Sequence, residues 1–306
     1  MNWNDLDWTT LLKLRKAFLS ETQNLRHEWR SLAELEAYEL TFAQRIGWKW
    51  ESVLRDLAKI GWEPKPETLI DWGCGTGIAS RKYLKTSLPQ TLSRIEVSDK
   101  SKMAEQFAMN NLREEFPESN IRVWDGKVRD RSLFLISHVL NHLTTADLEK
   151  LIVGLKQSGC FVWVESGLYS VSRKLIEIRE SFMDTFRVIA PCTHQAPCPL
   201  LNRENHTHWC HHFGKTPPHV FQDPHWAEYA KRMSIDLRSL PYSYLVMDRL
   251  SHPFPGAQTR IIGKPRTYKG FIKALACNAS GISEMTVTRQ KQPQIFSCLK
   301  KGQVII

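Results

Sequence analysis

A short stretch in which an acid is followed by glycines at alternate positions is the part of the chain best suited to bind a small molecule. It reads Thr68-Leu69-Ile70-Asp71-Trp72-Gly73-Cys74-Gly75-Thr76-Gly77. The apolar start with β-branched residues predicts a buried strand, and glycines at alternate positions let the backbone turn tightly and approach a ligand closely. A helix expected to begin near Ala79 would direct its N-terminal amides at that ligand. The spacing acid-x-Gly-x-Gly-x-Gly differs from the Gly-x-Gly-x-x-Gly of dinucleotide-binding folds.

This stretch resembles the first motif of class I S-adenosylmethionine (SAM) methyltransferases, whose cofactor carries no pyrophosphate. Asp99 follows the next candidate strand, where a carboxylate can accept hydrogen bonds from both ribose hydroxyls of a nucleoside, although it could also be a helix N-cap. Asp125 follows a third strand and could receive the adenine amino group, but Asp125-Gly126 is also a plain turn signal. The candidate SAM-binding residues are Asp71, Gly73, Gly75, Gly77, Asp99, Asp125 and Ser137.

The end of the fourth candidate strand is where class I enzymes usually place their chemistry. It reads Ile136-Ser137-His138-Val139-Leu140-Asn141-His142 and contains no Asn-Pro-Pro-Tyr-like clamp for an exocyclic amine. Cys192 and Cys198 each follow a proline, as the nucleophile of a cytosine-C5 methyltransferase does, but they lie far beyond this strand. His138 or His142 could act as a base, yet a structural histidine is the simpler interpretation. The sequence therefore assigns no catalytic residue.

Cysteines and histidines gather in the second half of the chain. Cys192, Cys198 and Cys210 lie among histidines and prolines, and Cys277 and Cys298 follow later. Thiolates bind Zn²⁺ or iron–sulfur clusters, and four cysteines suit a 4Fe–4S cluster. A zinc site would normally contain a tight Cys-x-x-Cys pair, which this chain lacks. A Cys/His zinc site and unligated thiols remain alternatives.

The composition favours a polyanionic partner and no membrane. The net charge is +10 with a pI near 9.3, as expected of a protein that binds nucleic acid. No apolar run reaches the ~18 residues that cross a bilayer, and the N-terminus resembles neither a signal peptide nor a transit peptide. A cytoplasmic, bacterial protein is the simplest inference, and seven cysteines without a secretion signal argue against a disulfide framework. Basic residues beside the cysteines and near the C-terminus are candidate RNA contacts: Arg203, Lys215, Arg260, Lys264, Arg266 and Lys269.

The elements that must position these residues form a repeated strand–helix pattern. Residues 6–62 are helix-like, and Pro64 and Pro66 separate them from the first strand. Candidate strands cover 68–72, 94–98, 121–124, 133–137 and 161–165, with helices between them that include 101–116 and 145–156. Such repeats predict a parallel sheet with right-handed crossovers. A further helix is expected over 172–188.

The pattern changes after residue 190. Strand character returns at 242–247 and 259–262, which we expect to be the last two, hairpin-paired strands of the sheet. Residues 263–306 resemble a small β-rich appendage. The predicted domains are a helical N-terminal subdomain (1–65), an α/β SAM-binding domain with a class I methyltransferase (Rossmann-like) sheet (66–262) that contains a Cys/His-rich metal-binding insertion (190–240), and the appendage.

Taken together, the motifs resemble the Rsm-twenty-two-like proteins of the small ribosomal subunit, whose mitochondrial relatives include methyltransferase-like protein seventeen. The resemblance covers residues from about 37 to 290. It rests on Asp71–Gly77, on Ser137-x-Val139-Leu140-Asn141-x-Leu143, on Pro191-Cys192-x-His194-x-x-Pro197-Cys198-Pro199 with Trp209-Cys210-His211, on Tyr242–Val246 and on Arg260–Gly270. The cysteine motif is the specific part, because the glycine motif occurs in many families.

The resemblance implies a class I methyltransferase fold, SAM binding, a 4Fe–4S cluster and association with the small ribosomal subunit and its 16S rRNA. The family's cluster ligands would fall on Cys192, Cys198, Cys210 and Cys277, and Cys298 competes for the fourth position. We expect a protein that is a monomer when free and methylates rRNA. Two alternatives stay open: a non-catalytic assembly factor with a vestigial methyltransferase fold, and a zinc-containing methyltransferase of another substrate.

Overall fold

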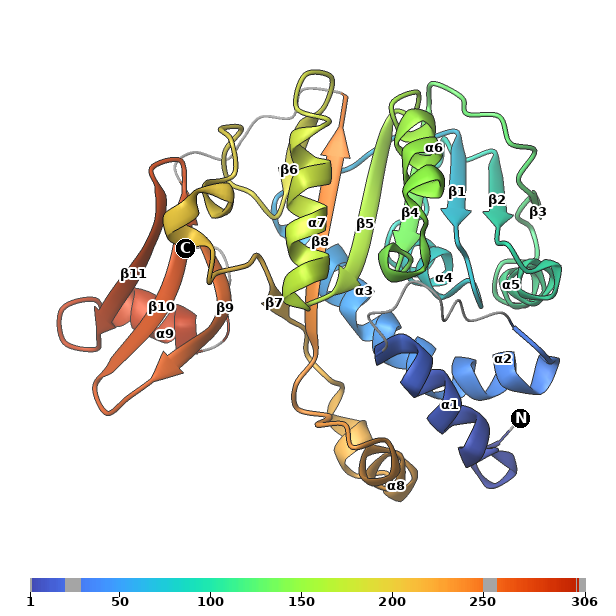
Figure 1. The fold of residues 1–306 in the computed structure, drawn as a ribbon, viewed down its shortest axis with the longest axis horizontal. Coiled ribbons are helices and arrows are strands. Elements are labelled where there is room, and N and C mark those ends of the chain that lie inside the picture. Colours follow the sequence, from blue (N-terminus) through green and yellow to red (C-terminus); the bar gives the residue numbers. More distant parts are fainter. Residues whose placement is uncertain (1, 20–28, 250–257, 301, 303–306) are drawn as a thin grey trace. The chain divides into compact units, whose positions relative to one another are not determined.

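The computed structural model describes residues 2–19, 29–249, 258–300 and 302. Its contacts form two compact units, one made of Met1–Val164 with Gly214–Leu240 and the other of Glu165–Phe213 with Pro241–Ile306 (Figure 1). The fold is α/β with a mostly parallel central sheet, as predicted. The predicted domain boundaries at residues 65 and 262 stay a prediction.

The first unit is built on five parallel strands in the order β3-β2-β1-β4-β5. Their bounds are β1 (Thr68–Trp72), β2 (Arg94–Ser98), β3 (Ile121–Val123), β4 (Ser132–Ser137) and β5 (Cys160–Ser166). Runs such as Leu133–Ile136 and Phe161–Val164 are almost fully buried, as expected when helices cover both faces of a parallel sheet. All five strands lie where the sequence predicts them.

The helices between these strands are α4 (Ile78–Thr86), α5 (Lys102–Glu115) and α6 (Thr145–Leu155). Side-chain caps begin α5 and α6, whereas α4 begins at Gly77 without one. The Ser101 side chain accepts a hydrogen bond from the Ala104 amide, and Thr144 forms a capping box with Asp147. Such caps satisfy amides that would otherwise have no partner at a helix start. The helices predicted at 101–116 and 145–156 are thereby confirmed.

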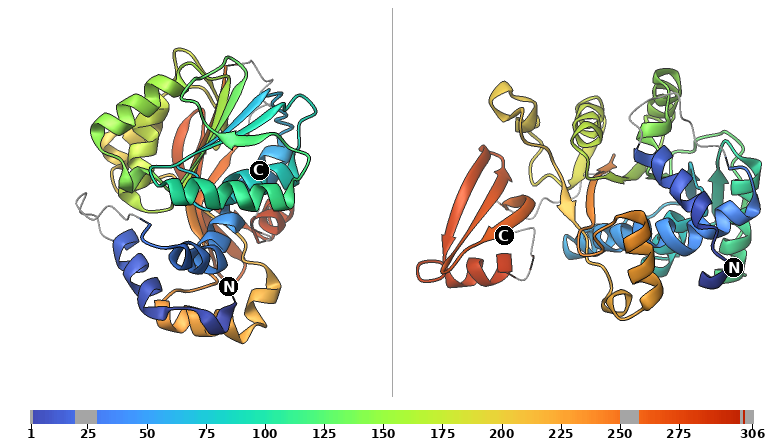
Figure 2. Two further views of the ribbon diagram at one scale, coloured as in Figure 1. Left: turned by 90° about the vertical axis from the view of Figure 1, so that its right-hand side faces the viewer. Right: turned by 60° about the horizontal axis from the view of Figure 1, so that its bottom comes forward.

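The N-terminal segment packs against a segment that is distant in sequence. It contains η1 (Trp3–Asp5), α1 (Trp8–Leu19), α2 (Leu32–Tyr38), the π-helical turn η2 (Glu39–Ala43) and α3 (Gln44–Lys59). A shared apolar core joins Leu11, Leu14 and Trp48 to residues of η6 (Pro218–Phe221) and α8 (Pro224–Met233). Figure 2 shows α8 beside the N-terminal helices. Residues 214–240, which the sequence grouped with the cysteines, thus support the N-terminal helices.

A buried ion-pair network ties the π-helical turn to the helices of the sheet. Arg81 of α4 is within 2.8 Å of Glu39 and within 2.9 Å of Glu115. Because Arg81 is almost fully buried, its charge needs a compensating carboxylate, and Glu39 and Glu115 both contact it. The network therefore fixes η2, and with it the neighbouring Tyr38, relative to the sheet.

The second unit combines helices with two groups of antiparallel strands. Its elements are α7 (Tyr169–Glu180), β6 (Arg187–Ala190), η4 (Pro199–Leu201), η5 (Arg203–Asn205), β7 (His212–Phe213), β8 (Pro241–Asp248), β9 (Arg260–Thr267), β10 (Phe271–Asn278), β11 (Gly281–Thr288) and α9 (Pro293–Lys300). Strand β8 pairs with β6 and β7. Strands β9, β10 and β11 form a separate three-stranded sheet.

Two expectations about this region are wrong. The helix predicted over 172–188 ends at Glu180, because the apolar residues 188–190 pair with β8 as a strand. The hairpin predicted between 242–247 and 259–262 does not form, since 260–267 pairs with β10. Both errors arise because a short apolar run does not itself specify its pairing partner. None of the helices in the described ranges is long and apolar enough to cross a membrane.

Candidate functional site

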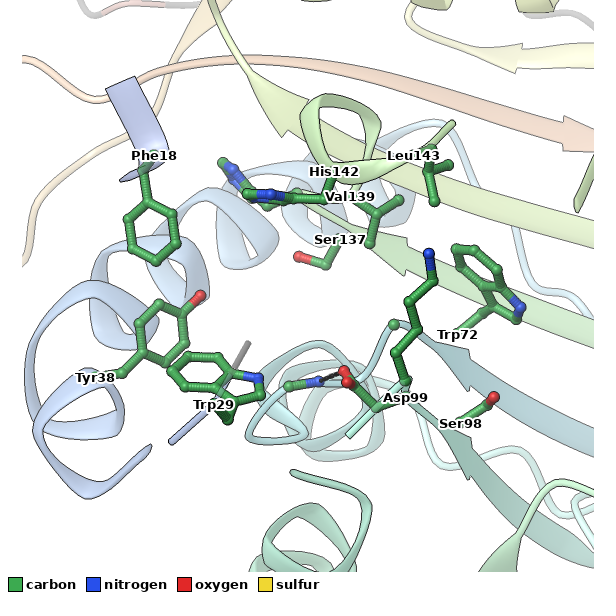
Figure 3. Close-up of a pocket in the computed structure, with 14 residues that line it drawn as sticks. Phe18, Trp29, Tyr38, Trp72, Ser98, Asp99, Ser137, Val139, His142 and Leu143 are labelled. Carbon is green, nitrogen blue, oxygen red and sulfur yellow. Dashed lines mark hydrogen bonds between the residues drawn. The ribbon is translucent and has the colours of Figure 1, made fainter. Parts of the chain in front are cut away.

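A cavity of about 260 Å³ opens at the carboxyl ends of β1, β2 and β4 in the first unit, the edge where open α/β sheets bind ligands. The sheet side contributes Trp72, Gly73, Gly75, Ser98, Asp99, Lys100, Ser137, His138, Val139, His142 and Leu143, and the N-terminal segment contributes Phe18, Trp29 and Tyr38. In Figure 3 the Phe18 and Tyr38 rings lie across the cavity from Trp72 and Leu143. We call this cavity the glycine-turn pocket.

The glycine turn lines this pocket because its backbone is left-handed. Gly73 and Gly75 have φ of +69° and +52°, which other residues adopt only at a cost. A Cβ on Gly73 would lie 2.6 Å from Val139, whereas a Cβ on Gly75 would meet no described atom within 4 Å. Gly75 therefore faces open space, where its missing side chain leaves room for a ligand. Gly77 begins α4 behind this turn.

Asp71 lies beneath the turn and does not belong to the described lining of the pocket. It is fully buried, and its Oδ2 accepts hydrogen bonds from the Ser80 amide (3.2 Å) and the Ser80 hydroxyl (2.6 Å). Burial raises the pKa of Asp71 to about 7 despite these bonds, since a buried carboxylate loses its hydration. Asp71 thus joins β1 to α4 and holds the turn in shape.

Asp99 lines the pocket, and its contact with a ribose stays a prediction. Its carboxylate accepts hydrogen bonds from the Gly75 and Ser101 amides, each at 3.0 Å (Figure 3). Burial raises the pKa of Asp99. The N-cap of α5 is Ser101, so Asp99 is not needed for that role. A carboxylate fixed between the turn and the end of β2 is well placed to accept hydrogen bonds from the hydroxyl groups of a ligand.

Asp125 is not brought together with these residues. It lies on the surface, 2.6 Å from the Arg129 guanidinium, and it is not among the described residues of the pocket. The Arg129 hydrogen bond lowers the pKa of Asp125 to about 2. Asp125 acts as a turn residue, because its side chain accepts a hydrogen bond from the Lys127 amide. This agrees with the turn signal in Asp125-Gly126 rather than with an adenine contact.

The end of β4 is held by residues that the sequence analysis did not connect with it. Ser137 Oγ accepts a hydrogen bond from Trp50 Nε1 at 2.9 Å, and His138 Nε2 lies 3.3 Å from Lys49 Nζ. His138 has a left-handed φ of +55°, and its amide donates to the Val164 carbonyl at 2.9 Å. Burial lowers the pKa of His138 well below its ordinary value. The neutral imidazole therefore accepts a hydrogen bond from Lys49 Nζ at Nε2 and carries its own proton on Nδ1.

The aromatic side of the pocket also comes from outside the glycine motif. Trp29 and Tyr38 are 5.1 Å apart, and Phe18 lies 5.9 Å from Tyr38 and 6.2 Å from His142, measured between ring centroids. These edge-to-face arrangements are favourable for aromatic pairs. Helical spacing alone assigns such residues to a core, so no signal in the sequence distinguishes this wall from ordinary packing.

The second unit brings four cysteines together. Cys192, Cys198 and Cys210 line a cavity of about 30 Å³, and Cys277 shares an apolar cluster with Cys198 and Cys210. Burial first, and then the neighbouring Cys192, raise the pKa of Cys198 to about 11 and that of Cys277 to about 12. Cys298 lies on α9 and is not part of this cluster. We call the first four residues the four-cysteine site.

Polar side chains surround the four-cysteine site with unused hydrogen-bonding capacity. His194 Nε2 lies 3.8 Å from Cys277 Sγ, and His212 Nε2 lies 3.7 Å from Cys210 Sγ. Among the described residues, the Nδ1 atoms of both histidines are buried without a partner, as are Arg179 Nε and Thr193 Oγ1. Buried polar atoms are rarely left unsatisfied, so their concentration here indicates room for another group.

No preformed site for a single ion accompanies these thiols. Within the described ranges, no three His, Cys, Asp or Glu side chains are arranged to hold one metal ion. The donor set nevertheless fits a thiolate-bound centre in chemical type. The structure thus provides the thiols and their convergence, but not a metal geometry.

Comparison with known proteins gives one family and several similar solved structures. A family model described as mitochondrial small ribosomal subunit Rsm22 matches residues 37–303. Comparison with the curated proteins gives no match. Solved structures similar to the chain include a candidate RNA methyltransferase from Pyrococcus horikoshii (14% identity, 66% of this chain and 85% of that one, TM-score 0.40). Others are a SAM-dependent methyltransferase from Aquifex aeolicus (14%, 54% and 93%, 0.39) and a geranyl diphosphate C-methyltransferase from Streptomyces coelicolor (15%, 73% and 86%, 0.37).

Proposed function

The chain belongs to the family mitochondrial small ribosomal subunit Rsm22, as the resemblance in its sequence predicted, and from this premise we propose that it binds SAM and methylates rRNA of the small ribosomal subunit. The observation that carries the proposal is the Asp99 carboxylate bound to the Gly75 amide at the rim of the glycine-turn pocket. This arrangement combines a hydroxyl acceptor with a backbone that leaves space for a ligand.

In this proposal each side of the pocket has a separate role. Asp99 accepts hydrogen bonds from the ribose hydroxyls of SAM, and the Gly73–Gly75 turn contacts the methionine end of SAM. Phe18, Trp29 and Tyr38 exclude water from the opposite side. When bound there, SAM supplies an electrophilic methyl group. Asp125 has no part in the proposal, because it pairs with Arg129 outside the pocket.

Calorimetry with SAM and transfer of labelled methyl groups to purified small subunits test this function. We expect saturable SAM binding and labelled rRNA. Absence of SAM binding to folded protein would remove the pocket assignment. Labelled protein or small molecules without labelled rRNA would instead favour a methyltransferase of another substrate.

A non-catalytic assembly factor is the second candidate, and the end of β4 favours it. The two side chains nearest the expected chemistry are already bonded, Ser137 to Trp50 and His138 to Lys49. The segment Ile136–His142 also contains no Asn-Pro-Pro-Tyr-like clamp for an exocyclic amine. SAM binding combined with methyl transfer no faster than the background would identify this second function.

We further propose that the four-cysteine site holds a 4Fe–4S cluster, with a Cys/His zinc site as the alternative. The supporting observations are the convergence of four thiols and the unpartnered polar atoms around them. Metal analysis of anaerobically purified protein distinguishes the two, because a cluster gives a brown protein with about four irons per chain. A colourless protein with zinc would support the alternative.

The proposed partner is rRNA, bound through exposed cations of β9 and of the turn that joins it to β10. Lys264 and Lys269 are exposed there, and Tyr268 stacks on Phe271 at 4.7 Å. Two of the predicted RNA contacts need correction: Arg260 is buried at 3% exposure, and Arg266 is paired with Glu284. Charge reversal of Lys264 and Lys269 should weaken co-sedimentation with small subunits and reduce its salt dependence.

Charge reversal of Lys65 and Lys150, which are equally exposed in the first unit, is the matched control. Equal losses of co-sedimentation in both double variants would show a general charge effect and exclude this binding face.

The family description refers to mitochondria and gives no support to the predicted bacterial cytoplasm. The monomeric state and a cytoplasmic location stay predictions.

A further inference from the structure

We propose that the aromatic rings of Phe18, Trp29 and Tyr38 bind the positively charged sulfonium group of SAM and thereby favour SAM over its neutral product, S-adenosylhomocysteine (SAH). We call these three side chains the aromatic wall. The proposal rests on the proposed binding of SAM in the glycine-turn pocket. It goes further, because it names the groups that distinguish the substrate form of the cofactor from the product form.

The aromatic wall is supported by the core of the N-terminal segment. All three rings pack against the apolar cluster that contains Leu11, Leu14 and residues of α8. The same three rings line the cavity and are only partly buried. The wall is therefore held in place and still accessible, so a ligand can contact it without an ordering cost.

Local features of the chain also fix two of these rings. Trp29 lies just before the start of α2, where Ser31 Oγ accepts a hydrogen bond from the Glu34 amide at 3.2 Å and the Glu34 carboxylate accepts one from the Arg30 amide at 2.8 Å. Tyr38 ends α2 and directly precedes the π-helical turn η2. Such turns are rare and occur frequently at functional sites, which is a second indication of a ligand beside Tyr38.

The covalent structure of SAM places its sulfonium in the cavity that the wall lines. The sulfur joins the ribose to the methionine chain, so it lies between the ribose contact at Asp99 and the methionine contact at the Gly73–Gly75 turn. Burial first, and then the charges of Glu39 and Asp99, raise the pKa of Tyr38. Tyr38 thus lies near the Asp99 carboxylate and carries an uncharged ring.

Aromatic rings suit this cation because it has no N–H groups to donate. The negative face of a ring attracts a cation that lies within ~6 Å of the ring centroid. Trp29 and Tyr38 meet at an interplanar angle of 66°, as do Phe18 and Tyr38. Steeply inclined rings of this kind form the aromatic cages that recognise quaternary ammonium groups. SAH has lost the charge and gains nothing from such a contact.

The test measures the affinities of three ligands by calorimetry. They are SAM, SAH and sinefungin, an analogue without sulfur that carries a protonated amine in place of the methyl group. Trp29→Leu and Tyr38→Leu remove a ring, whereas Trp29→Phe and Tyr38→Phe keep one. Phe42→Leu is the matched control, because Phe42 packs on Phe18 with 5.5 Å between ring centroids but is not among the described residues of the pocket.

We expect each leucine variant of the wall to lower the ratio of SAM affinity to SAH affinity about fivefold (~1 kcal/mol), the size of one cation–π contact. Sinefungin should lose affinity together with SAM, since it shares the charge but not the sulfur. The phenylalanine variants and Phe42→Leu should keep the wild-type ratio. Partial unfolding of a variant weakens all three ligands by one factor, so the ratio still reports on the contact.

Two failures can be distinguished. Wild-type protein that binds neither SAM nor SAH overturns the proposed function and this proposal with it. Leucine variants that lose SAM and SAH affinity equally overturn the sulfonium contact alone, because the rings then act only as apolar surface. Leucine variants that lose SAM affinity but keep sinefungin affinity also overturn it, since the rings then recognise the methyl group rather than the charge.

Discussion

Replacing Gly75 by alanine should separate ligand binding from folding. In the free protein the new Cβ would meet no described atom within 4 Å, so no clash opposes folding. The left-handed φ of +52° would still cost ~1–2 kcal/mol. The variant should therefore fold with a small loss of stability.

Binding should respond more strongly than stability does. The added methyl group projects into the space that the proposed ligand occupies beside the Asp99 carboxylate. We expect at least a tenfold weaker SAM affinity, or ~1.4 kcal/mol, measured by calorimetry. Gly75→Val, with a larger side chain, should bind more weakly still.

Gly61 provides the matched control for backbone strain. It has a φ of +69°, and a Cβ there would also meet no described atom within 4 Å, but it lies in the turn after α3 and is not among the described residues of the pocket. Gly61→Ala should lose a similar amount of stability and keep wild-type SAM affinity. Equal affinities for Gly75→Ala, Gly61→Ala and the wild type would refute the assignment of the pocket.

Three further predictions concern neighbouring charges and the thiols. Asp99→Ala should weaken SAM binding at least tenfold (~1.4 kcal/mol) in calorimetry, and unchanged affinity in folded protein would exclude the ribose contact. Burial raises the pKa of Asp71 from its ordinary 3.8 to about 7, so between these pH values the native state holds a proton that the unfolded state has lost. The free energy of unfolding should therefore fall by up to ~1.4 kcal/mol per pH unit as pH rises from 4 to 7. Asp71→Asn should flatten this slope in urea unfolding at pH 5, 6 and 7, and an unchanged slope would assign it to other groups. Cys277→Ser should lose iron while Cys298→Ser keeps it, since only Cys277 joins the other thiols; the reverse result would exchange the fourth ligand.

The sequence determined the elements around the glycine turn because their signals are local. The strand at 68–72, the left-handed glycines and the helix after them follow from β-branched residues and alternate glycines within one short stretch. The position of Asp99 could be predicted in the same way, since it directly follows the neighbouring parallel strand β2. Only a residue's own neighbours are needed to predict these features.

Tertiary structure decided which distant segments complete each site. Trp50 reaches Ser137, and Phe18, Trp29 and Tyr38 reach the pocket, only because the N-terminal helices pack on α8 and the ion pairs of Arg81 fix η2. Similarly, Cys277 joins Cys198 because β9 pairs with β10. Such pairings depend on burial and hydrogen bonds between segments that are far apart in the chain, and a local pattern fits several partners equally well until the whole core is packed.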